Sequence, residues 1–163
     1  MFRIGIIIAS DKGSAGQRED KSGPVVIAIL KEQPNIEIVE YKILPDEKKL
    51  IKNELIRFTD ELNLDLVITS GGTGVSPRDV TPDATLEILD KIIPGVAEAM
   101  RMEGFKKTPY AMISRAVAGI RGKSLIINLP GSPKAVEENL RVVLPVLSHL
   151  IEKIKGNGDD CGE

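Results

Sequence analysis

The chain has 163 residues, a length that suits one domain with a single sizeable hydrophobic core. Hydrophobic residues make up 42% of it and charged residues 28%, which is an ordinary balance for a globular protein. The net charge of −2 excludes a general electrostatic preference for nucleic acid or anionic membranes, so any anionic ligand has to be held by local geometry.

The first predicted element is a strand at residues 3–10. Its sequence, RIGIIIAS, is a nearly continuous apolar run, which is typical of a strand buried on both faces of a sheet. The run is too short to span a membrane and lacks the small-residue cleavage pattern of a signal peptide. The single cysteine, Cys161, can form no internal disulfide, which fits a reducing compartment. We therefore expect a cytoplasmic protein.

Two helices and two strands are predicted next. Residues 21–33 indicate a helix, and residues 36–44 alternate apolar and polar side chains, as a strand near a sheet edge does. Residues 46–62 indicate a second helix, and residues 64–70 indicate a third strand that is largely apolar. The second helix is expected to carry one apolar stripe, made of Leu50, Ile51, Leu55, Phe58 and Leu62.

The last predicted elements are a helix from Pro82 to about Lys91, a strand at residues 124–129 and a closing helix at residues 132–155. Proline at position 145 should kink or split the closing helix, because it cannot donate to the carbonyl group of Arg141. The buried face of this helix is expected to hold Val136, Leu140, Val143, Leu147 and Ile151.

Strands that alternate with helices predict an α/β sandwich around a mostly parallel sheet. We expect residues 1–155 to form one domain and residues 156–163 to form a flexible tail. Ligands of such sheets bind outside the carboxyl ends of the strands. The loops that matter for function are therefore those that follow strands, at residues 10–20, 44–47, 70–81 and 128–133.

The loop at residues 70–81 has the features of an anion site. Glycines at positions 71, 72 and 74 permit positive φ angles and close approach of a ligand to the main chain, whose N–H groups can hold an anion. Thr81, Pro82 and Asp83 form a favourable helix start, with Thr81 as the expected N-cap. A helix start beside a glycine loop favours phosphate. The alternative is a tight strand-to-helix turn that binds nothing.

Charged residues at two of these loops suggest a metal site. Arg78 can clamp phosphate oxygens, whereas Asp79 would repel a phosphate unless it held a cation such as magnesium. The alternative is a local Arg78–Asp79 pair or a capping carboxylate. Asp46 is either an ordinary N-cap of the second helix or a second acid on the same rim as Asp79. In the second case the two acids could bind one metal ion together, or one acid could bind the metal while the other orients the substrate.

The loop at residues 128–133, which follows the last strand, also combines a glycine with a helix start. Gly131 allows a close backbone turn, Ser132 is an expected N-cap, and Pro133 begins the final helix. Two anion sites of this kind are expected to face each other across one cleft. By contrast, residues 119–124 (GIRGKS) lack the first glycine of a Walker A loop and precede a strand, so we expect only a turn there, with Arg121 facing solvent.

Residues 69–85 (TSGGTGVSPRDVTPDAT) closely resemble the signature of molybdenum-cofactor biosynthesis proteins, in the molybdopterin adenylyltransferase branch. Residues 5–24, 43–47 and 111–140 are similar to other segments of that family, so the resemblance runs from about Arg3 to Lys155. It implies a three-layer α/β/α sandwich, usually a homotrimer. It also implies a reaction that joins the terminal phosphate of molybdopterin to the AMP of ATP, with Mg²⁺, and releases pyrophosphate.

The resemblance also implies roles for individual residues. Asp46 and Asp79 match the essential acids of the family, which we expect to be catalytic and to hold the magnesium ion. The other matched positions are expected to bind nucleotide or pterin: Ser10, Asp11, Lys12, Ser70, Gly71, Gly72, Thr73, Gly74, Arg78, Ser114, Arg115, Pro130, Gly131, Ser132 and Pro133.

Two alternatives to the adenylyltransferase remain open within the family. One is a non-catalytic protein that binds or delivers molybdopterin. The other is molybdate insertion, but proteins with that activity carry this module among further domains, for which 163 residues leave no room. The expected partners are ATP and molybdopterin, with neither nucleic acid nor membrane, and the resemblance further implies a transient contact with the molybdate-insertion protein.

Overall fold

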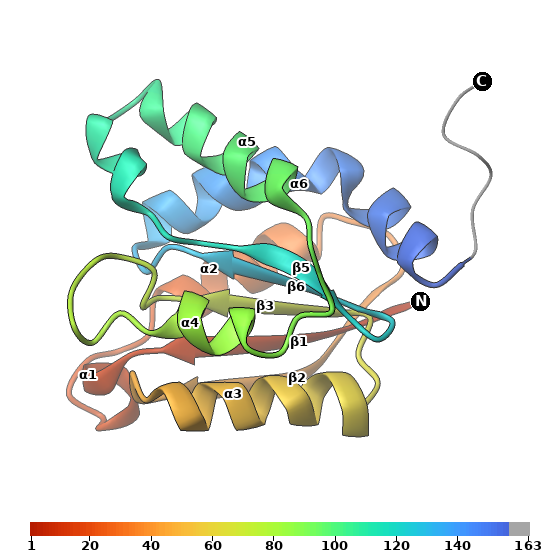
Figure 1. The fold of residues 1–163 in the computed structure, drawn as a ribbon, viewed down its shortest axis with the longest axis horizontal. Coiled ribbons are helices and arrows are strands. Elements are labelled where there is room, and N and C mark those ends of the chain that lie inside the picture. Colours follow the sequence, from red (N-terminus) through yellow and green to blue (C-terminus); the bar gives the residue numbers. More distant parts are fainter. Residues whose placement is uncertain (157–163) are drawn as a thin grey trace.

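The computed structural model describes residues 1–156 and contains one six-stranded sheet (Figure 1). The strands lie in the order β2-β1-β3-β6-β5-β4. Four of them, β2, β1, β3 and β6, pair in parallel, whereas β5 pairs antiparallel with β6 and β4 pairs antiparallel with β5. The strands are β1 (Phe2–Ala9), β2 (Ile36–Leu44), β3 (Leu66–Ser70), β4 (Lys91–Ile92), β5 (Ala118–Arg121) and β6 (Ser124–Leu129). The expected mostly parallel sheet is confirmed, and β2 lies at its edge as predicted.

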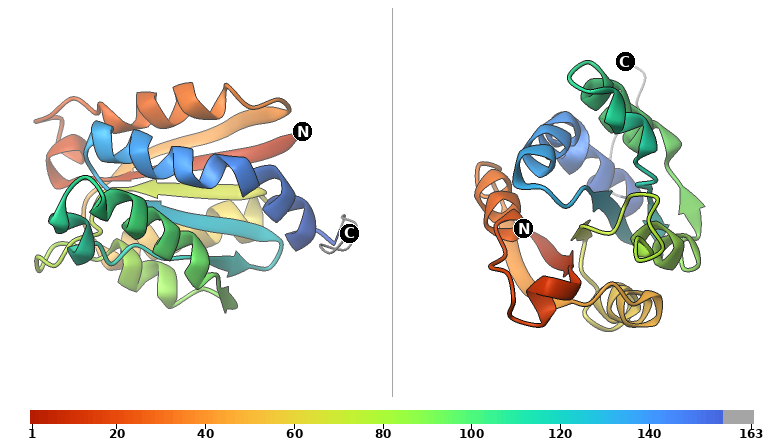
Figure 2. Two further views of the ribbon diagram at one scale, coloured as in Figure 1. Left: turned by 90° about the horizontal axis from the view of Figure 1, so that it is seen from above. Right: turned by 90° about the vertical axis from the view of Figure 1, so that its left-hand side faces the viewer.

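Helices cover both faces of the sheet, which confirms the three-layer sandwich (Figures 1 and 2). Helices α2, α5 and α6 lie on one face, and α3 and α4 lie on the other. The helical elements are α1 (Asp11–Ser14), α2 (Ser22–Leu30), α3 (Lys48–Ile56), the π-helical turn η1 (Arg57–Glu61), α4 (Thr81–Leu86), α5 (Pro94–Phe105), the 3-10 turn η2 (Pro109–Ile113) and α6 (Pro133–Ile154). No helix of the described residues is long and apolar enough to cross a bilayer.

The two helical layers explain the continuous apolar run of β1. Side chains alternate between the faces of a strand, so Ile4 and Ile6 enter the core under α2 and α6, whereas Ile7 enters the core above α3. All three side chains are fully buried. Both faces of the strand are therefore apolar. The carboxyl end of β1 lies at the rim of the sheet.

The closing helix α6 is one continuous helix of 22 residues that contains Pro145, so the expected split does not occur. Pro145 is exposed, and the carbonyl group that it cannot serve lies on the side of the helix where water can solvate it. The predicted apolar face is confirmed, because all five of its residues are buried: Val136, Leu140, Val143, Leu147 and Ile151.

Two boundaries differ from the sequence prediction. The helix after β2 changes to a π-helical turn at Arg57, and Leu50 is 46% exposed, so it does not belong to the buried stripe that contains Ile51 and Leu55. The helix expected to reach Lys91 ends at Leu86, because Lys91 belongs instead to the short strand β4, which pairs with β5.

Arg121 also differs from the sequence prediction. It does not simply face solvent, because it ends β5 and its guanidinium group bonds both carboxylate oxygens of Asp60 and the carbonyl group of Ile88. The turn itself is made by Gly122, whose φ angle is +56°. The expected flexible tail at residues 156–163 lies outside the described residues, apart from Gly156.

Candidate active site

Four loops meet at the carboxyl edge of the parallel strands, at the left-hand end of the molecule in Figure 1. They follow β1, β2, β3 and β6, and together they line a cavity of about 550 Å³. The predicted residues on its wall are Ser10, Asp46, Ser70, Gly71, Gly72, Asp79, Gly131, Ser132 and Pro133. The two glycine loops and the two acids that the sequence singles out therefore share one cavity.

The glycine loop after β3 approaches the neighbouring backbone too closely for any side chain at its first position. Gly71 has a φ angle of +97°, and a Cβ atom there would collide with the carbonyl oxygen of Ala9. Its N–H group donates to the carbonyl group of Leu129 at 3.1 Å. A Cβ atom on Gly131 would lie 3.4 Å from the Cα atom of Gly71, so the two glycine loops touch across the rim.

Asp46 and Asp11 orient each other. The N–H group of Asp11 donates to Oδ2 of Asp46 at 3.0 Å, and the N–H group of Asp46 donates to Oδ1 of Asp11 at 2.9 Å. The α3 N-cap position is Glu47 and no side chain caps the helix, so Asp46 is not an ordinary capping residue. Burial raises the pKa of Asp46, and the negative charges of Asp11 and Asp79 raise it further.

Two oxygens stand out beside this pair. Across residues 1–156, Asp46 Oδ1 and Thr81 Oγ1 are the buried side-chain oxygens with no hydrogen-bond partner. Both converge on the space that Gly72 leaves by lacking a side chain: a Cβ atom there would lie 2.5 Å from Thr81 Oγ1 and 3.0 Å from Asp46 Oδ1. We call this space the Gly72 cradle. Because orphaned buried oxygens are costly, the cradle is suited to a cation or to its water ligands.

Thr81 is not the N-cap of α4, contrary to the sequence prediction. The helix begins at Thr81 itself, Val80 occupies the cap position, and no side chain caps the helix. The N–H group of Thr81 donates to the carbonyl group of Gly72 at 3.1 Å, which turns its hydroxyl group toward the cradle instead.

Asp79 lies on the other side of the same cavity, in a small turn of its own. Its Oδ2 atom accepts hydrogen bonds from the N–H group of Ser76 at 3.0 Å and from the hydroxyl group of Ser76 at 2.7 Å. The carboxylate therefore closes the turn at residues 76–79, as the capping alternative expects. It also lines the cavity and acts on Asp46 through its charge, so the two acids belong to one site.

Arg78 does not pair with Asp79. Its guanidinium group holds both carboxylate oxygens of Asp11, at 3.0 and 2.8 Å, and Oε1 of Glu47 at 3.1 Å. These contacts tie the outer part of the Asp79 loop to the two loops beside it. Arg78 is exposed and does not line the cavity, and its contact with phosphate remains a prediction.

Most of the predicted serines hold the loops in shape. Ser10 caps α1 by accepting from the N–H group of Gly13, and Ser132 caps α6 as predicted. Ser70 donates to the carbonyl group of Pro130 at 2.8 Å, which joins the two glycine loops. Lys12 is exposed and lies off the cavity wall.

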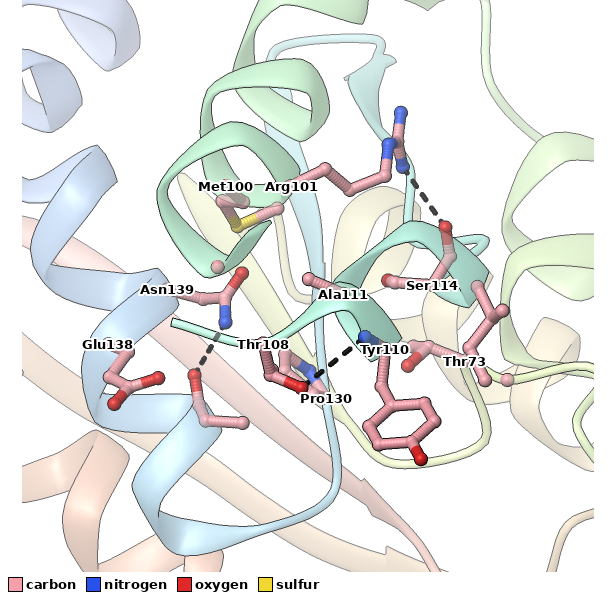
Figure 3. Close-up of a pocket in the computed structure, with 14 residues that line it drawn as sticks. Thr73, Met100, Arg101, Thr108, Tyr110, Ala111, Ser114, Pro130, Glu138 and Asn139 are labelled. Carbon is pink, nitrogen blue, oxygen red and sulfur yellow. Dashed lines mark hydrogen bonds between the residues drawn. The ribbon is translucent and has the colours of Figure 1, made fainter. Parts of the chain in front are cut away.

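A second cavity, of about 270 Å³, lies on the far side of the glycine loop (Figure 3). Four predicted residues belong to it, namely Thr73, Gly74, Ser114 and Pro130. The rest of its wall comes from α5, η2 and α6, and includes Met100, Arg101, Tyr110, Glu138 and Asn139. No motif in these segments marks them as functional, which is why sequence reasoning misses them.

Asp20, on the wall of the larger cavity, is a further residue that sequence reasoning misses. Its carboxylate accepts from the N–H groups of Ser22 and Gly23 at the start of α2 and from the hydroxyl group of Tyr41. Ser22 in turn donates to the carbonyl group of Gly131 at 2.6 Å. The signal was present in the sequence, since an Asp side chain at a helix start typically accepts from the N–H groups two and three residues further on.

The fold and the rim together define an α/β protein with a cleft between two glycine loops. Residues 5–149 match the family described as "Probable molybdopterin binding domain", and the chain belongs to this family.

Individual members of the family are similar over nearly the whole chain. The molybdopterin adenylyltransferase of Helicobacter pylori (strain J99) is 46% identical over 157 residues, which cover 96% of this chain and 89% of that protein. Among solved structures, the molybdopterin biosynthesis enzyme MoaB of Thermus thermophilus has a TM-score of 0.91 and 49% identity, covering 96% of this chain and 98% of that one. The molybdopterin biosynthesis Mog protein of Mycobacterium ulcerans has a TM-score of 0.87 and 41% identity, covering 94% and 99%.

Proposed function

We propose that the protein is a molybdopterin adenylyltransferase that transfers AMP from ATP to the terminal phosphate of molybdopterin. The observation that carries the proposal is the single cavity in which two glycine loops face the carboxylates of Asp46 and Asp79. Backbone N–H groups at such loops hold phosphate oxygens, and paired acids beside phosphate make sense only with a cation. The name of the similar Helicobacter pylori protein supports the same activity.

The chemistry is a displacement at the α-phosphorus of ATP. An oxygen of the molybdopterin phosphate forms a new bond to this phosphorus, the bond to the bridging oxygen breaks, and pyrophosphate leaves with the electron pair. A phosphate nucleophile is already ionised near neutral pH, so no general base is required. Because both reactants are anionic, the protein has to align them and offset their charge.

Magnesium fits the acids of this site. Asp46 offers the unpartnered Oδ1 atom and Asp79 lines the same cavity, so these two residues would hold the ion. No group of three or more His, Cys, Asp or Glu side chains within residues 1–156 is arranged to bind a metal. Two protein carboxylates with the remaining positions left to phosphate oxygens and water is the pattern that Mg²⁺ prefers. The bound ion would neutralise charge on the departing pyrophosphate.

The two cavities suit two substrates that must meet at one phosphorus atom. They share the glycine loop as a common wall: Gly71 and Gly72 face the larger cavity, and Thr73 and Gly74 face the smaller one. The larger cavity contains the acids and suits the triphosphate. The smaller cavity then takes part of the second reactant, next to Ser114.

The proposal includes a homotrimer in the cytoplasm and a transient contact with the molybdate-insertion protein, as the family resemblance implies. The exposure of several large apolar side chains on α5 and η2 supports an association surface, because exposed apolar groups favour contact with another protein. These side chains are Met102, Phe105, Tyr110, Met112 and Ile113.

The proposal predicts pyrophosphate release that depends on three components. Purified protein with ATP, Mg²⁺ and molybdopterin should release one pyrophosphate for each adenylylated pterin, and omission of the pterin or addition of EDTA should stop the release. A coupled pyrophosphate assay measures this. Tight binding of molybdopterin without pyrophosphate release under any of these conditions would instead identify the non-catalytic binding and delivery protein.

A further inference from the structure

We propose that Arg115 is a positioning residue that holds the glycine loop and Asp79 in their active arrangement and makes no contact with substrate. The inference rests on the proposed adenylyltransferase function and differs from the substrate-binding role that family resemblance implies for this position.

Every nitrogen of the Arg115 side chain donates to the loop or to the helix that follows it. Nε donates to the carbonyl group of Gly74 at 2.8 Å, and Nη2 donates to the carbonyl group of Asp79 at 2.6 Å. Nη1 and Nη2 also hold the two carboxylate oxygens of Asp83, at 3.1 and 2.9 Å. The N–H group of Arg115 itself donates to the carbonyl group of Thr73 at 2.8 Å.

These contacts leave the guanidinium group with little to offer a substrate. A guanidinium group has five N–H donors, and the loop contacts account for most of them. Arg115 does not line either cavity, although its neighbour Ser114 lines the smaller one. The position is thus next to the substrate region in sequence, but its charge is directed at the glycine loop and at Asp83.

The contacts fall at the two ends of the loop segment that carries the acid. Gly74 and Asp79 are the first and last residues of this segment, and the four residues between them are exposed. From the outside, Arg78 links the segment to Asp11 and Glu47 through exposed ion pairs. Arg115 bonds both ends of the segment, and the Asp79 side chain lines the cavity wall.

Arg115 also couples the two cavities. Its backbone holds Thr73 on the wall of the smaller cavity, while its side chain holds Asp79 on the wall of the larger one. Arg101 fixes the segment around Arg115 as well, by donating to the carbonyl groups of Ser114 and Ala116. A shift of this segment would therefore move the acid relative to both substrates, and a misplacement of about 1 Å can cost on the order of 100-fold in rate.

The chain offers a matched control at the opposite edge of the sheet. Arg121 also grips a carboxylate through two oxygens, those of Asp60, and also donates to a carbonyl group, that of Ile88. Arg115→Gln and Arg121→Gln therefore remove the same types of bond, one beside the cavities and one remote from them. Arg115→Lys keeps the charge and the contact with Asp83 but cannot serve all the carbonyl groups.

The test combines kinetics with hydrogen exchange. In Arg115→Gln we expect kcat for pyrophosphate release to fall about 100-fold. The KM values for ATP and molybdopterin should change little, and more Mg²⁺ should be needed for half-maximal rate. Amide exchange in a peptide covering residues 71–80 should accelerate. Arg115→Lys should recover part of kcat, and Arg121→Gln should leave kcat and exchange in this peptide as in the wild type.

Two results would overturn the proposal. A raised KM for either substrate with kcat unchanged would assign Arg115 a direct substrate contact. Exchange and kinetics in Arg115→Gln that match those of Arg121→Gln would reduce Arg115 to a general stabilising residue. Should the wild-type protein release no pyrophosphate, the proposed function fails separately. In that case amide exchange of residues 71–80 and calorimetric binding of Mg²⁺-ATP test the role of Arg115. Faster exchange in Arg115→Gln than in Arg121→Gln supports the positioning role. Weaker binding of Mg²⁺-ATP with unchanged exchange assigns a direct substrate contact, and equal exchange and binding in the two variants leave only a general stabilising role.

Discussion

Replacing Asp79 by asparagine is expected to abolish AMP transfer while the protein stays folded. Asparagine keeps an oxygen that can accept from Ser76, so the turn at residues 76–79 should persist. It removes the negative charge that a divalent cation needs. The loss of one preorganised electrostatic group at a site of developing charge costs roughly 10²- to 10³-fold in rate. Pyrophosphate release at saturating substrates measures the effect, and thermal unfolding verifies the fold.

Asp90→Asn is a suitable control for this experiment. Asp90 also accepts a backbone N–H group through its carboxylate, that of Gly122 at 2.7 Å, but it lies at the other edge of the sheet. Its variant should turn over as the wild type does. Wild-type turnover in Asp79→Asn would remove the metal role from this residue.

Replacing Gly72 by alanine should also eliminate turnover, because the new methyl group fills the Gly72 cradle. The Cβ atom would lie 2.5 Å from Thr81 Oγ1 and 3.0 Å from Asp46 Oδ1, which leaves no room for an ion or its water ligands. The φ angle of +65° adds a strain of about 1–2 kcal/mol to the free energy of folding. Urea unfolding measures the strain, and the pyrophosphate assay measures turnover.

Gly122→Ala separates these two effects. Gly122 has a similar φ angle of +56°, but a Cβ atom there has no neighbour within 4 Å. The variant should lose only the φ strain of about 1–2 kcal/mol, without the clash at Thr81, and keep its turnover. If Gly72→Ala behaves in the same way, the cradle has no part in the reaction.

The parallel part of the fold could be predicted because a strand that is buried on both faces of a sheet has a continuous run of apolar residues. Strands β1, β3 and β6 were found for this reason. Residues 91–121 give no such signal. Strand β4 has two residues, β5 has four, and α5 buries only Ala97 and Met100 while it exposes Met102 and Phe105, so its pattern has no clear helical period.

The rim residues could be located from the sequence, but their partners could not. A residue that follows a parallel strand has to lie on the carboxyl edge, and this places Asp46 and Asp79 beside the same cavity. The reach of an arginine depends instead on the path of its loop. Arg78 follows the chain directly into Asp79, yet it pairs with Asp11, 67 positions away. Thr81 likewise changed its role because α4 begins one residue earlier than its capping pattern suggests.

The most direct test of the cation site is an anomalous diffraction map from crystals grown with Mn²⁺ and a non-hydrolysable ATP analogue. We expect one manganese peak in the larger cavity, at a coordination distance of about 2 Å from a carboxylate oxygen of both Asp46 and Asp79 and in contact with the phosphates of the nucleotide. A manganese ion that binds the nucleotide but lies away from both carboxylates would contradict the account.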